Sequence, residues 1–135
     1  MAARNVSLFI LYSPDGKILL QHRSKDALML PDYWAFFGGG IEKGENPEQA
    51  LKREVLEELS YEVQSPLCLA TQKFVHKDEE GIKYVFVEKY QNHPLTLREG
   101  QGMGWFLPDE TEKLKMMDCD RTVILQIRDY LNSLD

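Results

Sequence analysis

The chain has 135 residues and a formal net charge of −6, from 22 acidic and 16 basic side chains. This length suits one domain, so residues 1–135 are expected to fold as a single unit. The acidic balance argues against a nucleic-acid duplex as the main ligand, because binding a phosphate backbone needs a basic face. No apolar run approaches the roughly 18 residues needed to span a bilayer, so no membrane partner is expected.

The two cysteines, Cys68 and Cys119, have no CxxC spacing. This spacing argues against a zinc site or a disulfide framework, and a reducing cytoplasm is the simplest setting. The N-terminal stretch 1–16 contains one arginine and a short apolar run that already has the composition of a strand. We interpret it as part of the fold and not as a signal peptide.

The first third of the chain predicts a hairpin followed by a short strand. Residues 6–12 and 17–22 are rich in apolar strand formers, and a Ser-Pro-Asp-Gly turn separates them. Residues 26–33 are irregular. Residues 34–37 predict a short aromatic strand that ends in a glycine turn at residues 38–40, where a ligand can approach the backbone.

A helix is predicted to begin at Pro47, a residue that suits the first helical position. Asn46 is placed to act as the N-cap, and Gln49 completes an Asn-x-x-Gln capping box. Apolar residues then recur every four positions and form a stripe toward the core: Leu51, Val55 and Leu59.

The second half of the chain predicts three more strands and a final helix. The strands are expected at residues 61–75, 82–90 and 105–107, and the helix at residues 121–134. A turn at residues 78–81 and a glycine-rich loop at residues 99–104 separate the strands. Strands that flank a central helix, with a second helix at the end, favour an α/β/α sandwich around a mixed sheet.

Three glutamates gather on one face of the central helix, beside its apolar stripe: Glu54, Glu57 and Glu58. Carboxylates at this spacing are close enough to share a hard cation, which prefers oxygen ligands. A solvated acidic face is the alternative, because repulsion between neighbouring carboxylates costs only about a few tenths of a kcal/mol per pair.

The spacing around these glutamates resembles the Nudix box, G-x5-E-x7-R-E-U-x-E-E-x-G-U, where U is a bulky apolar residue. Gly39, Glu45 and residues 53–58 match its fixed positions, and Tyr61 fills the last apolar position. Ser60 stands where the family has glycine. This difference affects only the exit of the helix, where glycine would serve as a C-cap.

The resemblance implies a Nudix hydrolase, which uses Mg²⁺ or Mn²⁺ to cleave a diphosphate linkage by attack of water. It also implies four metal ligands: Gly38 through its carbonyl, Glu54, Glu57 and Glu58. Glu45 would pair with Arg53 and orient the helix, since a planar guanidinium fits a carboxylate through two hydrogen bonds. Bound metal would neutralise phosphate oxygens and activate a water molecule.

Residues outside the box resemble MutT-type members of the family. Residues 98–101, Arg-Glu-Gly-Gln, look like the loop that supplies another glutamate, so Glu99 is the candidate for a metal ligand or for assisting the attacking water. Arg23 resembles the arginine that grips substrate phosphate. Asp120 falls where these enzymes carry an Asn or Asp that reads the purine. Each of these residues also has a structural alternative. Glu99 would then be a solvated loop acid, Arg23 a surface base and Asp120 a helix N-cap.

The aromatic run at residues 34–37 contains rings able to stack on a base. Because alternate residues of a strand face opposite sides, at most one or two of these rings can line a pocket. Phe36 is the candidate for this contact.

The substrate expected from these resemblances is a nucleoside triphosphate, hydrolysed to a monophosphate and pyrophosphate. ADP-ribose, a nucleotide sugar or a dinucleotide is the alternative, because the box defines the diphosphate chemistry and leaves the attached group open. A non-catalytic nucleotide-binding module is a third reading, disfavoured because no glutamate of the box is missing. A homodimer also stays open, since many relatives dimerise.

Overall fold

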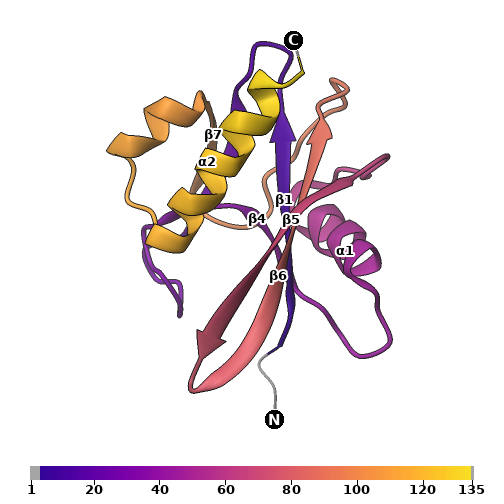
Figure 1. The fold of residues 1–135 in the computed structure, drawn as a ribbon, viewed down its shortest axis with the longest axis vertical. Helices are drawn as coiled ribbons and strands as arrows, with labels where there is room; N and C mark the ends of the chain where they lie inside the picture. Colours follow the sequence, from indigo (N-terminus) through magenta and orange to yellow (C-terminus); the bar gives the residue numbers. More distant parts are fainter. Residues whose placement is uncertain (1–3, 135) are drawn as a thin grey trace.

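The strands form one mixed sheet, with β1 at its centre (Figure 1). The computed structural model describes residues 4–134, so residues 1–3 of the predicted N-terminal element and residue 135 lie outside the described part. The elements are β1 (Val6–Tyr12), β2 (Ile18–His22), β3 (Trp34–Ala35), β4 (Phe37–Gly40), α1 (Pro47–Leu59), β5 (Leu67–His76), β6 (Glu79–Lys89), β7 (Gly102–Phe106), the 3₁₀ helix η1 (Pro108–Lys113) and α2 (Asp118–Asn132).

β1 pairs with strands from both halves of the chain. It is antiparallel to β2 and β4 and parallel to β6, along which it pairs from Val6–Lys83 to Tyr12–Lys89. The other strand pairs of the described chain, β2–β3, β2–β7 and β5–β6, are antiparallel. The predicted mixed sheet is therefore confirmed.

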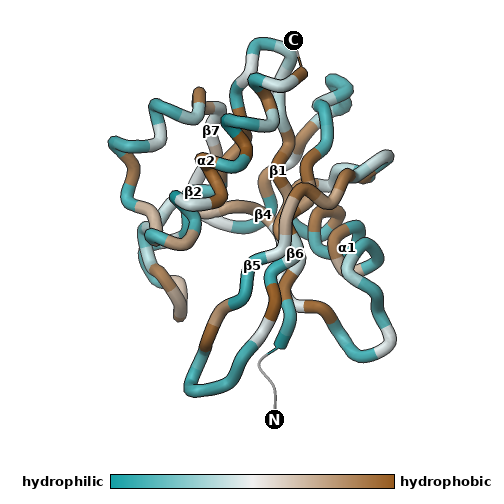
Figure 2. Tube along the Cα trace, viewed as in Figure 1, coloured by the Kyte–Doolittle hydropathy of each residue, from teal (hydrophilic) through white to brown (hydrophobic). Residues whose placement is uncertain are grey.

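The two helices cover opposite faces of the sheet (Figure 1). Alternation along β1 supplies both faces, since Phe9 and Leu11 pack in the core cluster with α1, whereas Ile10 packs in the cluster with α2. Figure 2 shows that β1 is hydrophobic along most of its length, while the tip of the β5–β6 hairpin is hydrophilic. This arrangement confirms the predicted α/β/α sandwich.

The start of α1 lies where the sequence predicts it. The side-chain oxygen of Asn46 accepts a hydrogen bond from the Gln49 N–H at 2.8 Å, and the Gln49 side chain accepts one from the Asn46 N–H at 2.9 Å. The buried hydroxyl of Ser7 in β1 donates to the Pro47 carbonyl at 2.7 Å. This last bond ties the first turn of the helix to the central strand.

Two predictions about glycine-rich segments are wrong. Residues 38–40, predicted as a turn, belong to β4, in which Gly38 pairs with Leu8 and Gly40 with Val6. Gly102 pairs with His22, so β7 begins there and not at residue 105. Glycine has a poor intrinsic strand propensity, and in both places pairing with a neighbouring strand overrides it.

The limits of the β5–β6 hairpin also differ from the prediction. Strand β5 begins at Leu67 and not at residue 61, although Tyr61 and Val63 are buried. Their alternation comes from core packing of an irregular segment and not from a strand. The hairpin turn lies at Lys77 and Asp78, which both have positive φ angles, so β6 starts earlier than predicted.

The last helix begins at Asp118, three residues before the predicted start. Its N-cap is Met117, which makes no side-chain capping bond, so the sequence contains no capping residue to mark this end. Asp120 therefore lies inside the first turn. The alternative interpretation of Asp120 as the N-cap is wrong.

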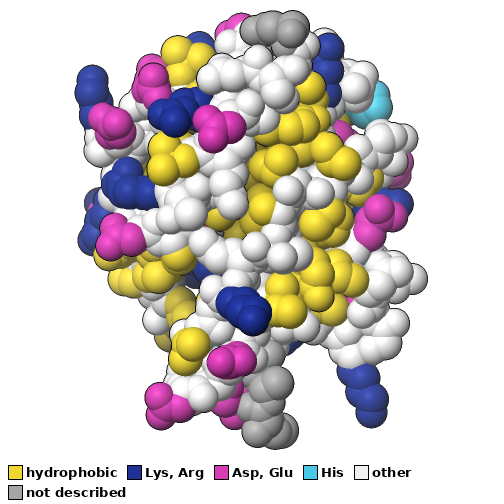
Figure 3. Space-filling model, in the orientation of Figure 1, with side chains coloured by type: hydrophobic (Ala, Val, Ile, Leu, Met, Phe, Trp, Pro, Cys, Tyr) yellow, Lys and Arg dark blue, Asp and Glu magenta, His cyan; other side chains and the backbone are white. Residues whose placement is uncertain are grey.

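Several large hydrophobic side chains are exposed on the outer surface. Leu125 of α2 is 52% exposed, and Leu67 and Val75 of β5 are 49% and 68% exposed. Figure 3 shows hydrophobic side chains in a band across the middle of one face, with charged side chains toward its rim. No helix within residues 4–134 has the length and hydropathy needed to cross a membrane.

Candidate active site

The site is built on the backbone of Gly38 in β4. Gly38 has a φ of +131°, and a Cβ atom there would lie 2.1 Å from the Ser7 carbonyl oxygen. Only glycine fits both this conformation and this close approach. The Gly38 N–H donates a hydrogen bond to Oε1 of Glu58 at 2.8 Å, which joins the strand to the acidic face of α1.

Glu58 is a buried carboxyl, with 5% of its surface exposed. Burial, followed by the hydrogen bond with Glu99 and the negative charges of Glu99 and Glu54, raises the pKa of Glu58 to about 9, against the lowering effect of the Gly38 N–H. Glu58 is therefore protonated at neutral pH in the metal-free protein. The structure brings together Gly38, Glu58 and Glu99, three of the predicted site residues.

Arg53 organises a second group of carboxylates on the same helix. Its Nε and Nη2 atoms donate to the two carboxylate oxygens of Glu45, at 2.7 and 2.9 Å. Its Nη1 donates to Glu54 at 2.9 Å, and Nη2 also donates to the Gly40 carbonyl at 3.1 Å. The hydrogen bonds from Arg53 lower the pKa of Glu45 to about 2, and Glu45 raises the pKa of Arg53 in return. The bidentate pair matches the orienting role implied by the resemblance.

Glu54 lies directly against β4. A Cβ atom on Gly39 would lie 2.5 Å from the Glu54 carboxyl carbon, so the missing side chain leaves the space that this carboxylate fills. Glu57 points outward, with 61% of its side chain exposed, and its nearest charged partner is Arg53 at 3.8 Å. Among residues 4–134, no group of three His, Cys, Asp or Glu side chains is already gathered as a metal site.

Gln21 is a site residue that the sequence analysis missed. It is 2% exposed, and its Nε2 donates to the Glu99 carbonyl at 3.1 Å. The Gln101 N–H donates to the His22 carbonyl at 2.9 Å, just beyond Glu99. The sequence signal that could have identified Gln21 is its position, because it is a polar residue that directly follows the apolar residues of β2.

Arg23 follows β2 and holds the irregular segment that comes after it. Its Nε donates to the Met29 carbonyl at 3.0 Å, and its N–H donates to the Tyr33 carbonyl at 2.8 Å. The carbonyl of Arg23 accepts from the side chain of Gln101 at 2.7 Å, so this segment is joined to the Glu99 loop.

Phe36 and Asp120 lie on the α2 side of the sheet. Phe36 is 6% exposed and belongs to the core cluster that contains α2 residues. Asp120 is also 6% exposed, and burial raises its pKa, whereas the positive charge of Lys83 lowers it. Gln72, whose side chain donates to the Cys119 carbonyl at 3.1 Å, has a buried Oε1 without a hydrogen-bond partner in the described structure. The first turn of α2 is therefore a polar region within an apolar layer.

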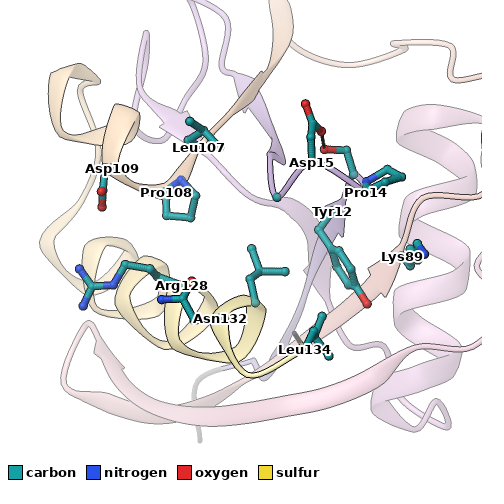
Figure 4. A pocket seen from close by; sticks show the side chains of 13 residues that line it. Tyr12, Pro14, Asp15, Lys89, Leu107, Pro108, Asp109, Arg128, Asn132 and Leu134 are labelled. Carbon is teal, nitrogen blue, oxygen red and sulfur yellow. Dashed lines mark hydrogen bonds between the residues drawn. The ribbon is translucent and has the colours of Figure 1, made fainter.

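A cavity of about 790 Å³ lies at the far end of β1 from Gly38 (Figure 4). Its lining residues include Tyr12 at the end of β1, Pro108 of η1, Arg128 of α2 and Leu134, which follows α2. None of the predicted site residues lines this cavity, although the structure describes all of them. The cavity is separate from the acidic site.

Comparison with known proteins identifies the family. The family described as NUDIX domain matches residues 1–127, so the chain belongs to the Nudix family. Over 49 residues it is 47% identical to the nucleoside triphosphatase NudI of Escherichia coli O139:H28 (strain E24377A / ETEC). That match covers 36% of this chain and 35% of NudI, so the chain spans about a third of the length of the curated relatives that it matches.

Solved structures share the fold over nearly the whole chain. The solution structure of the E. coli ORF135 protein has a TM-score of 0.80 and 26% identity, and the match covers 93% of this chain and 89% of that one. The crystal structure of a MutT protein from Methanosarcina mazei Go1 has a TM-score of 0.83 and 19% identity, with 97% and 96% coverage. The predicted fold and family resemblance are both confirmed.

Proposed function

We propose that this protein is a Nudix hydrolase that uses Mg²⁺ or Mn²⁺ to cleave nucleoside triphosphates into a monophosphate and pyrophosphate. The observation that carries the proposal is the meeting of Glu58 and Glu99 beside the Gly38 N–H. Two acidic side chains in contact are costly unless a proton or a cation joins them. The similarity to NudI, which is named a nucleoside triphosphatase, supports the substrate class.

The residues at this site fit a divalent cation. Glu54, Glu57, Glu58 and Glu99 would hold it, with the Gly38 carbonyl as a further ligand, and all of these offer the oxygen donors that Mg²⁺ prefers. The approach of Glu54 to Gly39 leaves no room for another side chain between the carboxylate and the strand. When bound, the cation would neutralise phosphate oxygens and lower the pKa of a water molecule.

The protein's own groups have distinct tasks in this proposal. Glu58 would hold the cation as the anion, because the ligand form of a carboxyl is deprotonated. Glu99 accepts a proton from the water molecule as it attacks phosphorus and the diphosphate P–O bond breaks. Arg53, held by Glu45, keeps Glu54 in place.

Substrate recognition is proposed for residues outside the box. Arg23 would form charge-assisted hydrogen bonds to phosphate oxygens once the nucleotide displaces its contact with the Met29 carbonyl. Phe36 and Asp120 would contact the base from the α2 side of the sheet. Because the carboxyl of Asp120 is buried, a base edge that hydrogen-bonds to it would give a partner to a polar group that is shielded from water.

The test is a panel of nucleoside triphosphates, ADP-ribose, nucleotide sugars and dinucleotides, assayed with Mg²⁺ and with product identification. We expect pyrophosphate and a monophosphate from the triphosphates, and no turnover in EDTA. Glu57→Gln and Glu58→Gln should abolish turnover and leave the fold intact, whereas the matched control Glu48→Gln, an exposed glutamate in the first turn of α1, should be as active as the parent.

Other results would select another function. Preferential turnover of ADP-ribose, a nucleotide sugar or a dinucleotide would replace the triphosphate with that substrate class. Tight nucleotide binding without turnover of any compound would identify a non-catalytic module. Unchanged activity in both Glu57→Gln and Glu58→Gln would refute the metal assignment.

Location and assembly are further expectations. Cys68 and Cys119 are both free thiols, which supports the proposed reducing cytoplasm. The exposed hydrophobic side chains of β5 and α2 would supply apolar surface for a homodimer, which the family resemblance leaves open. Light scattering of the purified protein tests the dimer through its mass.

A further inference from the structure

The segment that carries Glu99 is fastened to the end of α1 by its backbone. The Thr96 N–H donates to the Leu59 carbonyl at 2.9 Å, and the Arg98 N–H donates to the Glu58 carbonyl at 2.8 Å. The last carbonyls of a helix have no partner within the helix, so these two bonds satisfy groups that would otherwise be orphaned. Glu99 is therefore one residue away from an attachment point on the catalytic helix.

Ser60 ends this helix in a conformation that favours glycine. It has φ 53° and ψ 32°, in the left-handed region, and its N–H donates to the Leu56 carbonyl at 3.0 Å. A residue with a Cβ atom is less stable there than glycine. Position 60 is also where the sequence departs from the Nudix box, which has glycine there.

The side chain of Ser60 makes a contact that glycine cannot make. Its hydroxyl oxygen accepts a hydrogen bond from Nε of Arg98, the residue directly before Glu99. On the other side of Glu99, Gln21 donates to its carbonyl and Gln101 donates to the His22 carbonyl. Glu99 is thus held from α1 on one side and from β2 on the other.

We infer that Ser60 is a positioning residue that holds Glu99 against Glu58 by acting through Arg98. Glu99 forms a hydrogen bond with Glu58, and this contact depends on where the segment that carries Glu99 lies. The Ser60–Arg98 hydrogen bond holds the residue that directly precedes Glu99. The helix end gives up some stability in return, since glycine would suit the left-handed position better. This inference rests on the proposed function, which gives Glu99 its catalytic task.

The experiment compares Ser60→Gly and Ser60→Ala with the parent. Both variants lose the hydroxyl, so we expect kcat to fall by about threefold to tenfold, the range that one hydrogen bond controls, with KM little changed. We also expect the amides of Thr96 and Arg98 to exchange with solvent several times faster in the metal-free protein. Ser60→Gly should nevertheless have a higher Tm than the parent, whereas Ser60→Ala should not.

Two further variants serve as controls. Arg98→Gln should give the same loss of kcat, and combining it with Ser60→Gly should add nothing, because both remove one contact. Lys77→Gly removes a side chain from a similar left-handed position, φ 51°, in the β5–β6 turn. It should raise Tm and leave both kcat and the exchange of the Arg98 amide unchanged.

Unchanged exchange and unchanged kcat in Ser60→Gly would overturn the inference. A fall in kcat of the same size in Lys77→Gly would also overturn it, because the effect would then follow stability and not the contact with Arg98. If the parent hydrolyses no nucleotide, the proposed function fails and the catalytic role of Ser60 fails with it. The exchange measurement would still decide, without any substrate, whether Ser60 holds the Glu99 segment.

Discussion

Replacing Glu58 by glutamine is expected to stabilise the metal-free protein and to remove part of its pH dependence. Glutamine has the shape of a protonated glutamic acid and keeps an oxygen to accept the Gly38 N–H and an N–H group to donate to Glu99. The perturbation therefore removes the ionisation of this site and keeps its hydrogen bonds. Nothing else at the site needs to move.

The size of the effect follows from the two pKa values of Glu58. The carboxyl has its ordinary pKa of 4.5 in the unfolded chain, and a pKa of about 9 in the folded protein. Between these values the folded state holds a proton that the unfolded state has lost, so the free energy of unfolding falls as pH rises. From pH 5 to pH 7 this loss is about 2.5 kcal/mol, at roughly 1.4 kcal/mol per unit of pH well above the unfolded pKa.

Urea denaturation in EDTA at pH 5, 6, 7 and 8 measures this difference. The free energy of unfolding of Glu58→Gln minus that of the parent should grow with pH, because the contributions of the other titrating groups cancel. Glu57→Gln, in an exposed side chain of the same helix, should follow the parent. Parallel pH curves for the parent and Glu58→Gln would refute the raised pKa, and with it the interpretation of Glu58 as a protonated carboxyl awaiting a cation.

Three other predictions concern the site. Gly38→Ala should lower the free energy of unfolding by at least about 2 kcal/mol, because its Cβ would overlap the Ser7 carbonyl. The control is Gly44→Ala, whose Cβ meets nothing within 4 Å. An equal loss of stability in this control would contradict the prediction. Glu99→Gln should slow turnover by roughly one to several orders of magnitude with an unchanged Tm, and a variant as fast as the parent would make Glu99 a surface acid. Asp120→Asn should change the ranking of kcat/KM among nucleoside triphosphates with different bases; an unchanged ranking would exclude Asp120 from base recognition.

Local interactions made the start of α1 predictable. The capping box of Asn46 and Gln49 acts within one helical turn, and the structure confirms it. The pair Glu45–Arg53 spans eight residues and was predicted by the resemblance, because a guanidinium and a carboxylate define their own geometry. The arrangement of residues that interact over a short stretch of chain can therefore be predicted from the sequence alone.

Contacts between distant segments were not predictable in the same way. Gly38–Gly40 has the composition of a turn, and only the presence of β1 alongside makes it a strand. The support of Glu99 by Gln21 joins two elements far apart in the chain, so no local pattern marks it. The start of α2 was predicted three residues late because Met117 gives the helix no capping side chain.

The parallel pairing of β1 with β6 has a consequence for how the protein folds. Val6 and Lys83 are neighbours in the sheet, although more than half of the 135-residue chain separates them. Closing so long a loop is slow, because its entropic cost comes before the contacts that repay it. A refolding chain is therefore expected to form α1 early, with its box glutamates in solvent, and to gain the proposed hydrolytic activity only when β6 and the segment that carries Glu99 have docked.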